Sequence, residues 1–475
     1  MRDLPPLHSA RTGLRNSGCS WWDHQANTIW IGDYDTDQLA QTAASHEMNH
    51  FWMHVSTPYG RLLDELTSTR NNQVLQYCIR HMQEYPFGQI SIPVHDVIKR
   101  LRATAAIGAR RDLCERFARP WSHTVFLENV LEGETFPEVL RAEASTATYS
   151  FQMVEAYLDQ MAALPNADPD VPDDYPDTAT SGSGVPDATL PDGSTFPLGA
   201  KHVFEGIATQ MTLSSPVKKE DMSGGTNPYY WILWTHWVKE TMHNRPVQSA
   251  EDYRRFRNTF YALCDLALFV PAGGLYRQLR GDDLDWADIQ PGYRFLSLVR
   301  EAKQEDWIED LGTGLLPYQE QMSHLLSWPL PRDFLELGAN LQEDGANARR
   351  HRDACRIRLA DHAAFLNFES RVEKGGPAGQ FWTEHHPMIF LPHRGELIVK
   401  KGDTAGDSLT HILDWFFANF NWSVMRTGGF SYEEFLPEKL AYDDAFENIS
   451  TRAELVNLIH QAIPVLSPER FRELQ

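Results

Sequence analysis

One segment near the N-terminus constrains the fold more than any other, because it predicts a strand followed at once by an amphipathic helix. Residues 27–34 (NTIWIGDY) form a short run of alternating apolar character that ends in Gly-Asp, which is typical of a strand. Asp35 and, three residues later, Gln38 form a capping-box pattern that predicts the start of a helix. Five residues then recur at the spacing of one helix face: Leu39, Ala43, His46, His50 and Met53.

Residues 46–50 of this predicted helix are His-Glu-Met-Asn-His, an HExxH motif. Positions i and i+4 are neighbours on one face of a helix, so the imidazoles of His46 and His50 can bind one Zn²⁺. Glu47 then lies beside the open coordination position, where it can take a proton from water and pass it to a leaving amine. The motif therefore predicts a metal centre with Glu47 as the general base.

The third ligand of this centre has to come from elsewhere in the chain. His54 continues the row, but a rise of 1.5 Å per residue places it about 12 Å along the axis from His46. The longer motif HExxHxxGxxH also fails, since Met53 and Ser56 occupy the positions of its glycine and third histidine. Four glutamates on later predicted helices are candidates: Glu205, Glu155, Glu128 and Glu132.

His46, Glu47, His50 and a distal glutamate resemble the gluzincin class of zinc metallopeptidases. The resemblance covers the motif helix, the strand before it and residues 197–210. It implies a zincin-like catalytic core in a mainly α (α+β) chain, a bound Zn²⁺ and the cleavage of peptide bonds. Several strands precede the motif helix in that class, whereas only 45 residues precede the motif here. The strand expected to align an extended substrate is therefore Thr28 to Gly32.

Glu205 is the favoured third ligand. Its predicted helix follows a loop, and the small residues Gly206 and Ala208 let that helix pack closely against another, such as the motif helix. A glutamate followed by Gly, an apolar residue and Ala also resembles the third-ligand segment of many gluzincins. Glu155 is the first alternative, because it begins an ExxxD pattern found in the same class, in which Asp159 would orient a metal-bound histidine.

Zinc-dependent hydrolysis also requires a hydrogen-bond donor to the oxyanion that forms on the attacked carbonyl. Tyrosine and histidine usually supply this donor. The candidates nearest to Glu205 in the sequence follow its helix, and nothing in the sequence distinguishes among them: Tyr229, Tyr230, His236 and His243.

Composition limits the partners of the chain. Its 475 residues carry a formal net charge of −22, which argues against nucleic acids and anionic membrane surfaces as partners. No apolar run is long enough to span a membrane, and the first residues lack the apolar stretch of a secretion signal. Five widely spaced cysteines without a CxxC pair predict free thiols, and therefore a cytoplasmic location.

The rest of the chain predicts a mainly α protein with two or three short strands. Expected helices cover 61–84, 93–118, 121–163, 199–213, 227–243 and 249–270, and most of 284–475. Residues 164–197 form an acidic loop with a small hairpin around Asp192-Gly193, and a second hairpin turns at Arg394-Gly395. We expect a metallopeptidase region at 1–245 and a helical region at 246–475, which would recognise the substrate or a regulatory protein.

These features predict a cytoplasmic zinc-dependent protease that cleaves a peptide bond in a protein or peptide substrate. Its site would comprise Glu47 and a Zn²⁺ held by His46, His50 and Glu205. The acidic loop 164–197 would act as a lid or docking element, and a regulatory partner would control activity. The alternative is a catalytically silent helical scaffold, with or without a metal.

Overall fold

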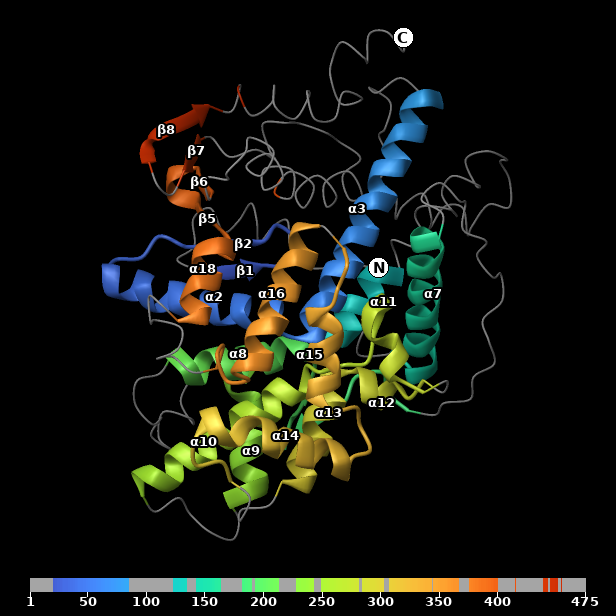
Figure 1. Ribbon diagram of the computed structural model, residues 1–475, viewed down its shortest axis with the longest axis vertical. Coiled ribbons are helices and arrows are strands. Elements are labelled where there is room, and N and C mark those ends of the chain that lie inside the picture. The colour runs from blue at the N-terminus through green and yellow to red at the C-terminus, as the bar shows by residue number, and fades with distance from the viewer. Residues whose placement is uncertain are drawn as a thin grey trace.

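The structure is a computed structural model, shown in Figure 1. It describes residues 20–84, 123–134, 142–163, 182–189, 193–212, 228–242, 249–281, 284–302, 307–343, 345–366, 376–399, 415, 439–442, 445–451 and 454. The helix expected at 93–118 and residues 164–181 and 190–192 of the expected acidic loop lie outside these ranges.

The N-terminal elements follow the predicted strand-then-helix order. Strands β1 (Trp21–Asp23) and β2 (Thr28–Trp30) form an antiparallel pair, and helix α2 (Asp37–Ser56) follows. The predicted cap at Asp35 is wrong by one residue. Thr36 has the extended backbone of a cap, and its hydroxyl accepts a hydrogen bond from the Leu39 amide at 3.3 Å.

Helix α2 ends where the sequence predicts. Thr57 has extended backbone geometry, and α3 (Pro58–Glu84) begins at the next residue. Proline has no amide hydrogen to donate within the preceding helix, but it fits the first turn of a new one. The chain therefore turns sharply, and α3 packs against α2 and α16 (Ala346–Ala360).

Six short strands form the main sheet, in the order β1-β2-β5-β6-β7-β8. The last four are β5 (Met388–Leu391), β6 (Glu396–Val399), β7 (Lys439–Tyr442) and β8 (Ala445–Thr451). The expected hairpin at Arg394-Gly395 is confirmed, with Gly395 at φ 60° after a 3₁₀ turn at Pro392–Arg394. The expectation of only two or three strands is wrong, because these strands are too short to stand out in the sequence.

Strand β2 lies inside this sheet. It pairs antiparallel with β1 and parallel with β5, in the register Thr28 to Met388. The strand expected at Thr28 to Gly32 is therefore not an edge, since both of its sides are hydrogen-bonded. The edge on this side of the sheet is β1, whose outer side faces no other described strand.

Helices make up most of the described chain, which confirms a mainly α fold. One correction concerns residues 121–163, expected as one helix. Helical residues 123–132 stop at Gly133, whose φ of 70° ends the helix, and α7 starts at Ala144. The remaining helices are α7 (Ala144–Ala163), α8 (Ala200–Thr212), α9 (Pro228–Met242), α10 (Ala250–Ala267), α11 (Gly273–Tyr276), α12 (Trp286–Ile289), α13 (Pro291–Glu301), α14 (Leu311–Leu325), α15 (Pro331–Ala339) and α18 (Pro377–His385), with a 3₁₀ turn at Arg277–Leu279.

The smaller sheet is the expected hairpin around Asp192-Gly193. Strands β3 (Asp187–Thr189) and β4 (Thr195–Pro197) pair antiparallel, and Gly193 adopts φ 84°. Gly193 therefore supplies the left-handed conformation that the turn requires. The hairpin leads directly into α8.

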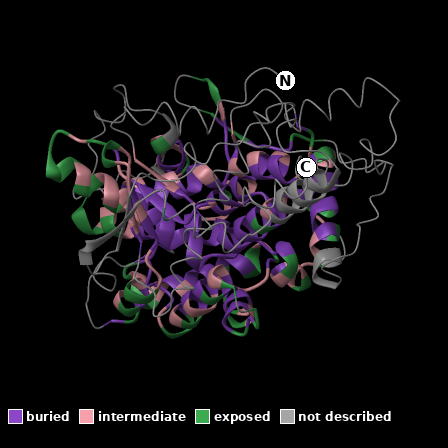
Figure 2. Ribbon diagram, turned by 90° about the horizontal axis from the view of Figure 1, so that it is seen from above, coloured by how far each residue is buried: buried purple, intermediate pink, exposed green. Residues whose placement is uncertain are grey.

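The core packs around α8 and α10 and crosses residue 245, the boundary expected between two regions. One buried cluster joins Tyr59 and Phe151 to Phe260, Phe295 and Phe334. Figure 2 shows buried ribbon concentrated in the centre of the molecule, with exposed residues around it. In Figure 1, α2 lies between the first strands of the main sheet and the helices that follow α8. None of the described helices combines the length and the apolar character needed to cross a membrane.

Candidate metal centre

The HExxH motif stands where α2 changes from an exposed helix to a buried one. Residues 37–45 are exposed or half-buried, whereas Glu47, Asn49 and all residues from His50 to Ser56 are buried. The apolar residues of this second half pack against α18, α16 and Trp22 of β1. His46 therefore lies at the boundary between the exposed first turns of α2 and its buried second half.

Helix α8 lies alongside α2 and carries Glu205. Its start is held by the close approach of two glycines, because a Cβ on Gly199 would lie 2.2 Å from the backbone of Glu132 and Gly133. The side chain of Asn49 in α2 reaches the α8 backbone and donates to the carbonyl of Ala208 at 3.5 Å. The glycine contact fixes the start of α8, and the Asn49 hydrogen bond ties α8 to the motif helix.

Gly206 does not face the motif helix, although the sequence suggested that it would let α8 pack there. A Cβ on this residue would meet the ring of Phe260 at 3.3 Å and the side chain of Leu233 at 3.7 Å. The small residue therefore allows α8 to approach α10 and α9, not the motif helix. Because the opposite face of α8 packs on α2, Glu205 still projects toward the histidines.

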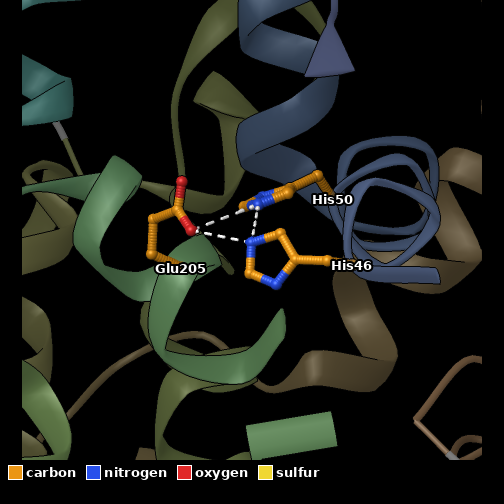
Figure 3. Close-up of side chains that lie close together, drawn as sticks. All are labelled: His46, His50 and Glu205. Carbon is orange, nitrogen blue, oxygen red and sulfur yellow. Dashed lines mark hydrogen bonds and ion pairs between the residues drawn. The ribbon is translucent and has the colours of Figure 1, made fainter. Parts of the chain in front are cut away.

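Three side chains converge between α2 and α8 (Figure 3). Nε2 of His46 lies 2.9 Å from Oε2 of Glu205, and Nε2 of His50 lies 3.4 Å from the same oxygen. The two imidazole nitrogens are 3.2 Å apart. Sequence reasoning selected these three residues, and the structure places them together although Glu205 is 159 positions from His46.

The donor set and its spacing fit Zn²⁺. Two imidazole nitrogens and one carboxylate oxygen are the ligands typical of a zinc site that keeps one position open. Zinc bonds of about 2.0–2.2 Å require tetrahedral ligands to lie about 3.3–3.6 Å apart. The separations of 2.9, 3.2 and 3.4 Å are close to these values, so small side-chain movements suffice to enclose an ion.

The charges of these three residues shift the pKa values within the cluster. Burial alone would raise the pKa of Glu205, but the charges and hydrogen bonds of His50 and His46 hold it well below its usual range. For His50, burial opposes the charged form, yet the Glu205 carboxylate and Glu47 raise its pKa. Glu205 is therefore an ionised carboxylate, which is the form that binds a cation.

Glu47 lies beside this cluster and is 7% exposed. Burial raises its pKa, and the charges of His50 and His46 offset part of that effect. The backbone of Trp22 in the edge strand β1 also hydrogen-bonds the Glu47 carboxylate. The predicted general base is thus held between the two histidines and β1, the outermost described strand on this side of the main sheet.

The other glutamates considered as third ligands lie elsewhere. Glu155 in α7 forms an ion pair with Arg280, with 2.7 Å between its Oε2 and Nη2 of the arginine. Glu128 and Glu132 lie on helical residues 123–132 and gather around His24. Within the described residues, this second group and the group of His46, His50 and Glu205 are those that could hold a metal ion. Sequence reasoning missed His24, because no motif links it to either glutamate.

His54 takes no part in the candidate centre, as the helix rise predicts. It is buried and hydrogen-bonds Asp64 in α3 at 3.0 Å. Of the four residues considered as oxyanion donors, Tyr230 lies beside the centre, with its ring centroid 5.9 Å from that of His46. His236 lies farther along α9 and is half-buried. The side chain of Tyr229 and the whole of His243 lie outside the described part of the chain.

Comparisons with known proteins leave the site to be judged on its own geometry. No protein-family model matches the chain, and no curated protein sequence or solved structure matches it.

Proposed function

We propose that this protein is a zinc-dependent peptidase in which His46, His50 and Glu205 hold the metal and Glu47 is the general base. The observation that carries the proposal is the convergence of these residues. Three ligand atoms come together from two helices, and their motif places a buried carboxylate beside them. A Zn²⁺ bound there would polarise the scissile carbonyl and lower the pKa of a water molecule.

Glu47 suits the role of a proton carrier. Its position after His46 on α2 directs it to the side of the cluster that β1 borders, and the Trp22 backbone fixes one of its oxygens. From this position it takes a proton from the attacking water and returns it to the leaving amine. The burial that surrounds it excludes competing water and strengthens each of these interactions.

The open side of the site is suited to a peptide. Residues 37–45 of α2 are exposed or half-buried, and Tyr230 at the start of α9 is 41% exposed. The outer edge of β1, which faces no other described strand, lies at the same site, since its Trp22 contacts Glu47. An extended substrate segment that pairs with β1 would carry its backbone past the metal position. The net charge of −22 favours protein or peptide partners over nucleic acid.

We place the enzyme in the cytoplasm. Cys264 and Cys355 are buried free thiols, which is the state that a reducing compartment maintains. A lid role for residues 164–197 and substrate recognition by residues 246–475 remain predictions of the same proposal.

The test is cleavage of a mixed peptide library by zinc-loaded protein, with new N-termini identified by mass spectrometry. We expect cleavage that a chelator abolishes and that Zn²⁺ restores. Glu47→Gln has the same shape and keeps both histidines, so it should retain zinc and lose about 10²–10⁴-fold in rate. Because this variant is purified in the same way, it also controls for contaminating proteases. Equal cleavage by both proteins, or none by the zinc-loaded wild type, would favour the scaffold alternative.

A further inference from the structure

A second group of metal-binding side chains lies outside the candidate peptidase site. His24 lies in the turn between β1 and β2, while Glu128 and Glu132 project from one face of helical residues 123–132. Each of the three offers one ligand atom, and these atoms all lie within 4.8 Å of one another. Nε2 of His24 lies 3.3 Å from Oε1 of Glu128, which equals the ligand spacing of a tetrahedral zinc site.

The imidazole of His24 has no hydrogen bond to a described residue at the nitrogen that would bind a metal. Its Nε2 is buried and makes no hydrogen bond with any described group, although Glu128 lies nearby. A buried polar atom without a hydrogen bond costs about 1–3 kcal/mol, so such atoms call for an explanation. An ion bound between His24 and the two carboxylates would satisfy this nitrogen.

Apart from His24, the two carboxylates share a single cationic partner among the described residues. Like charges at positions i and i+4 destabilise a helix, and Glu128 and Glu132 are such a pair. Arg70 forms an ion pair with Oε2 of Glu128, and Gln25 donates to Oε1 at 3.5 Å. Glu132 has no ion pair or hydrogen bond to a described residue. One half-buried carboxylate thus has no ion-pair partner among the described residues.

The surroundings hold the ligands in position. The ring of His24 stacks on that of His54, with 5.7 Å between centroids, and His54 is fixed by Asp64. The ion pair of Arg70 with the outer oxygen of Glu128 orients this carboxylate and leaves Oε1 toward His24. Hydrogen-bonded partners of this kind typically support the ligands of metal sites.

We propose that His24, Glu128 and Glu132 bind a second divalent transition-metal ion, of the Zn²⁺ or Mn²⁺ class. One imidazole and two carboxylates suit these metals, whereas copper(I) prefers sulfur ligands and Ca²⁺ prefers oxygen alone. The ion joins the turn after β1 to helical residues 123–132. Since His24 is two residues from Trp22, it also fixes the strand that contacts Glu47. Its role is structural and independent of the peptidase proposal.

The test is metal stoichiometry of the full-length protein. Chelator-treated protein is loaded with Zn²⁺ alone, or with Mn²⁺ alone in a second arm, then desalted and analysed for bound metal. In at least one of the two arms, we expect wild type to bind one more ion per chain than Glu132→Gln does. The same difference is expected between wild type and His24→Gln. Glu134→Gln is the matched control, because its partner Lys201 lies outside the cluster, and it should bind as wild type does. Equal binding by wild type and both ligand variants, with either metal, overturns the proposal.

A second measurement does not depend on the folding of those variants. Glu205→Gln removes a ligand of the first site and leaves the second unchanged. With Zn²⁺, this protein should keep one ion, whose X-ray absorption spectrum shows one imidazole in the first shell. An ion with two imidazoles, or no ion after loading with Zn²⁺ and no ion after loading with Mn²⁺, contradicts the second site. The peptidase activity of Glu47→Gln is measured in a separate experiment. Failure of the peptidase proposal can therefore be distinguished from failure of the second metal site.

Discussion

Arg280 holds Glu155 through two hydrogen bonds, of 3.3 Å to Oε1 and 2.7 Å to Oε2. Both side chains are largely buried, at 12% and 8% exposed. This pairing explains why Glu155, a candidate zinc ligand by sequence, serves the stability of the fold instead. Both oxygens of this carboxylate are engaged by Arg280, so neither is available to a metal between α2 and α8.

Glu155→Gln should lower the free energy of unfolding by about 3–5 kcal/mol, because it leaves the Arg280 charge buried without a partner. Chemical denaturation measures this change. Glu134→Gln is the matched control. Its partner Lys201 is 41% exposed, so the same substitution there should cost less than about 1 kcal/mol. Similar losses in the two variants would contradict the assignment of Glu155 to a buried ion pair.

Tyr230→Phe should reduce kcat by about 10²–10³-fold without changing the zinc content. The tyrosine ring lies beside that of His46, and the substitution removes the hydroxyl proposed to donate to the oxyanion. Steady-state kinetics on a peptide identified from the library gives the comparison. His236→Gln changes a residue farther along the same helix and should leave kcat unchanged. Equal effects of the two substitutions would show that α9 matters for packing and not for the reaction.

Gly60→Ala should destabilise the protein by at least about 1–3 kcal/mol, since a Cβ at this position would lie 1.7 Å from the carbonyl oxygen of His54. The clash involves backbone at the junction of α2 and α3, so a side-chain rotation cannot relieve it. Gly281→Ala is the control, because nothing lies within 4 Å of the added carbon. Thermal unfolding of the two variants side by side measures the difference. A stable Gly60→Ala protein would mean that the two helices meet in another way.

The stability of the fold should depend on pH through His351. Its Nδ1–H donates to the carbonyl of Val55 at 3.0 Å, and its Nε2 accepts from the Tyr276 hydroxyl at 2.5 Å. Burial, with a smaller contribution from the charge of Arg61, lowers the pKa of His351 to about 4 from the ordinary 6.5. Between pH 4 and 6.5, the imidazole of His351 is therefore protonated more readily in the unfolded chain than in the folded chain.

The stabilisation that neutral His351 gives to the folded state is fully present above pH 6.5 and is lost as the pH falls through 4. The difference in pKa corresponds to about 3 kcal/mol of unfolding free energy. Unfolding curves of wild type and His351→Gln between pH 7 and 4 test this. The wild type should lose about 3 kcal/mol more than the variant over that range. Parallel losses in the two proteins would contradict it.

Local patterns in the sequence predict the features that depend on neighbouring residues. The strand before the motif, the break at Pro58 and the turn at Gly395 each follow from the conformational preferences of a few adjacent residues. Glu205 was selected in the same way, from small residues near it. The reason was partly wrong, because Gly206 faces Phe260 and not the motif helix.

Features that depend on distant residues could not be predicted. Strand β2 becomes internal only because Met388 pairs with Thr28, and nothing near Thr28 encodes that partner. Glu128 and Glu132 lie around His24 and not at the motif helix, and this association arises only when the chain folds. The capping error at Asp35 is of another kind. Two adjacent residues could both cap the helix, and backbone geometry selects Thr36.

The most direct test of the central claim is the zinc content of Glu205→Gln compared with wild type and Glu155→Gln. All three proteins are loaded with Zn²⁺ and desalted before analysis. The account predicts that Glu205→Gln binds one zinc per chain fewer than wild type, because it loses the carboxylate that faces His46 and His50. Glu155→Gln should bind as much zinc as wild type. Unchanged zinc in Glu205→Gln, or its loss in Glu155→Gln instead, would contradict the assignment of His46, His50 and Glu205 as the metal centre.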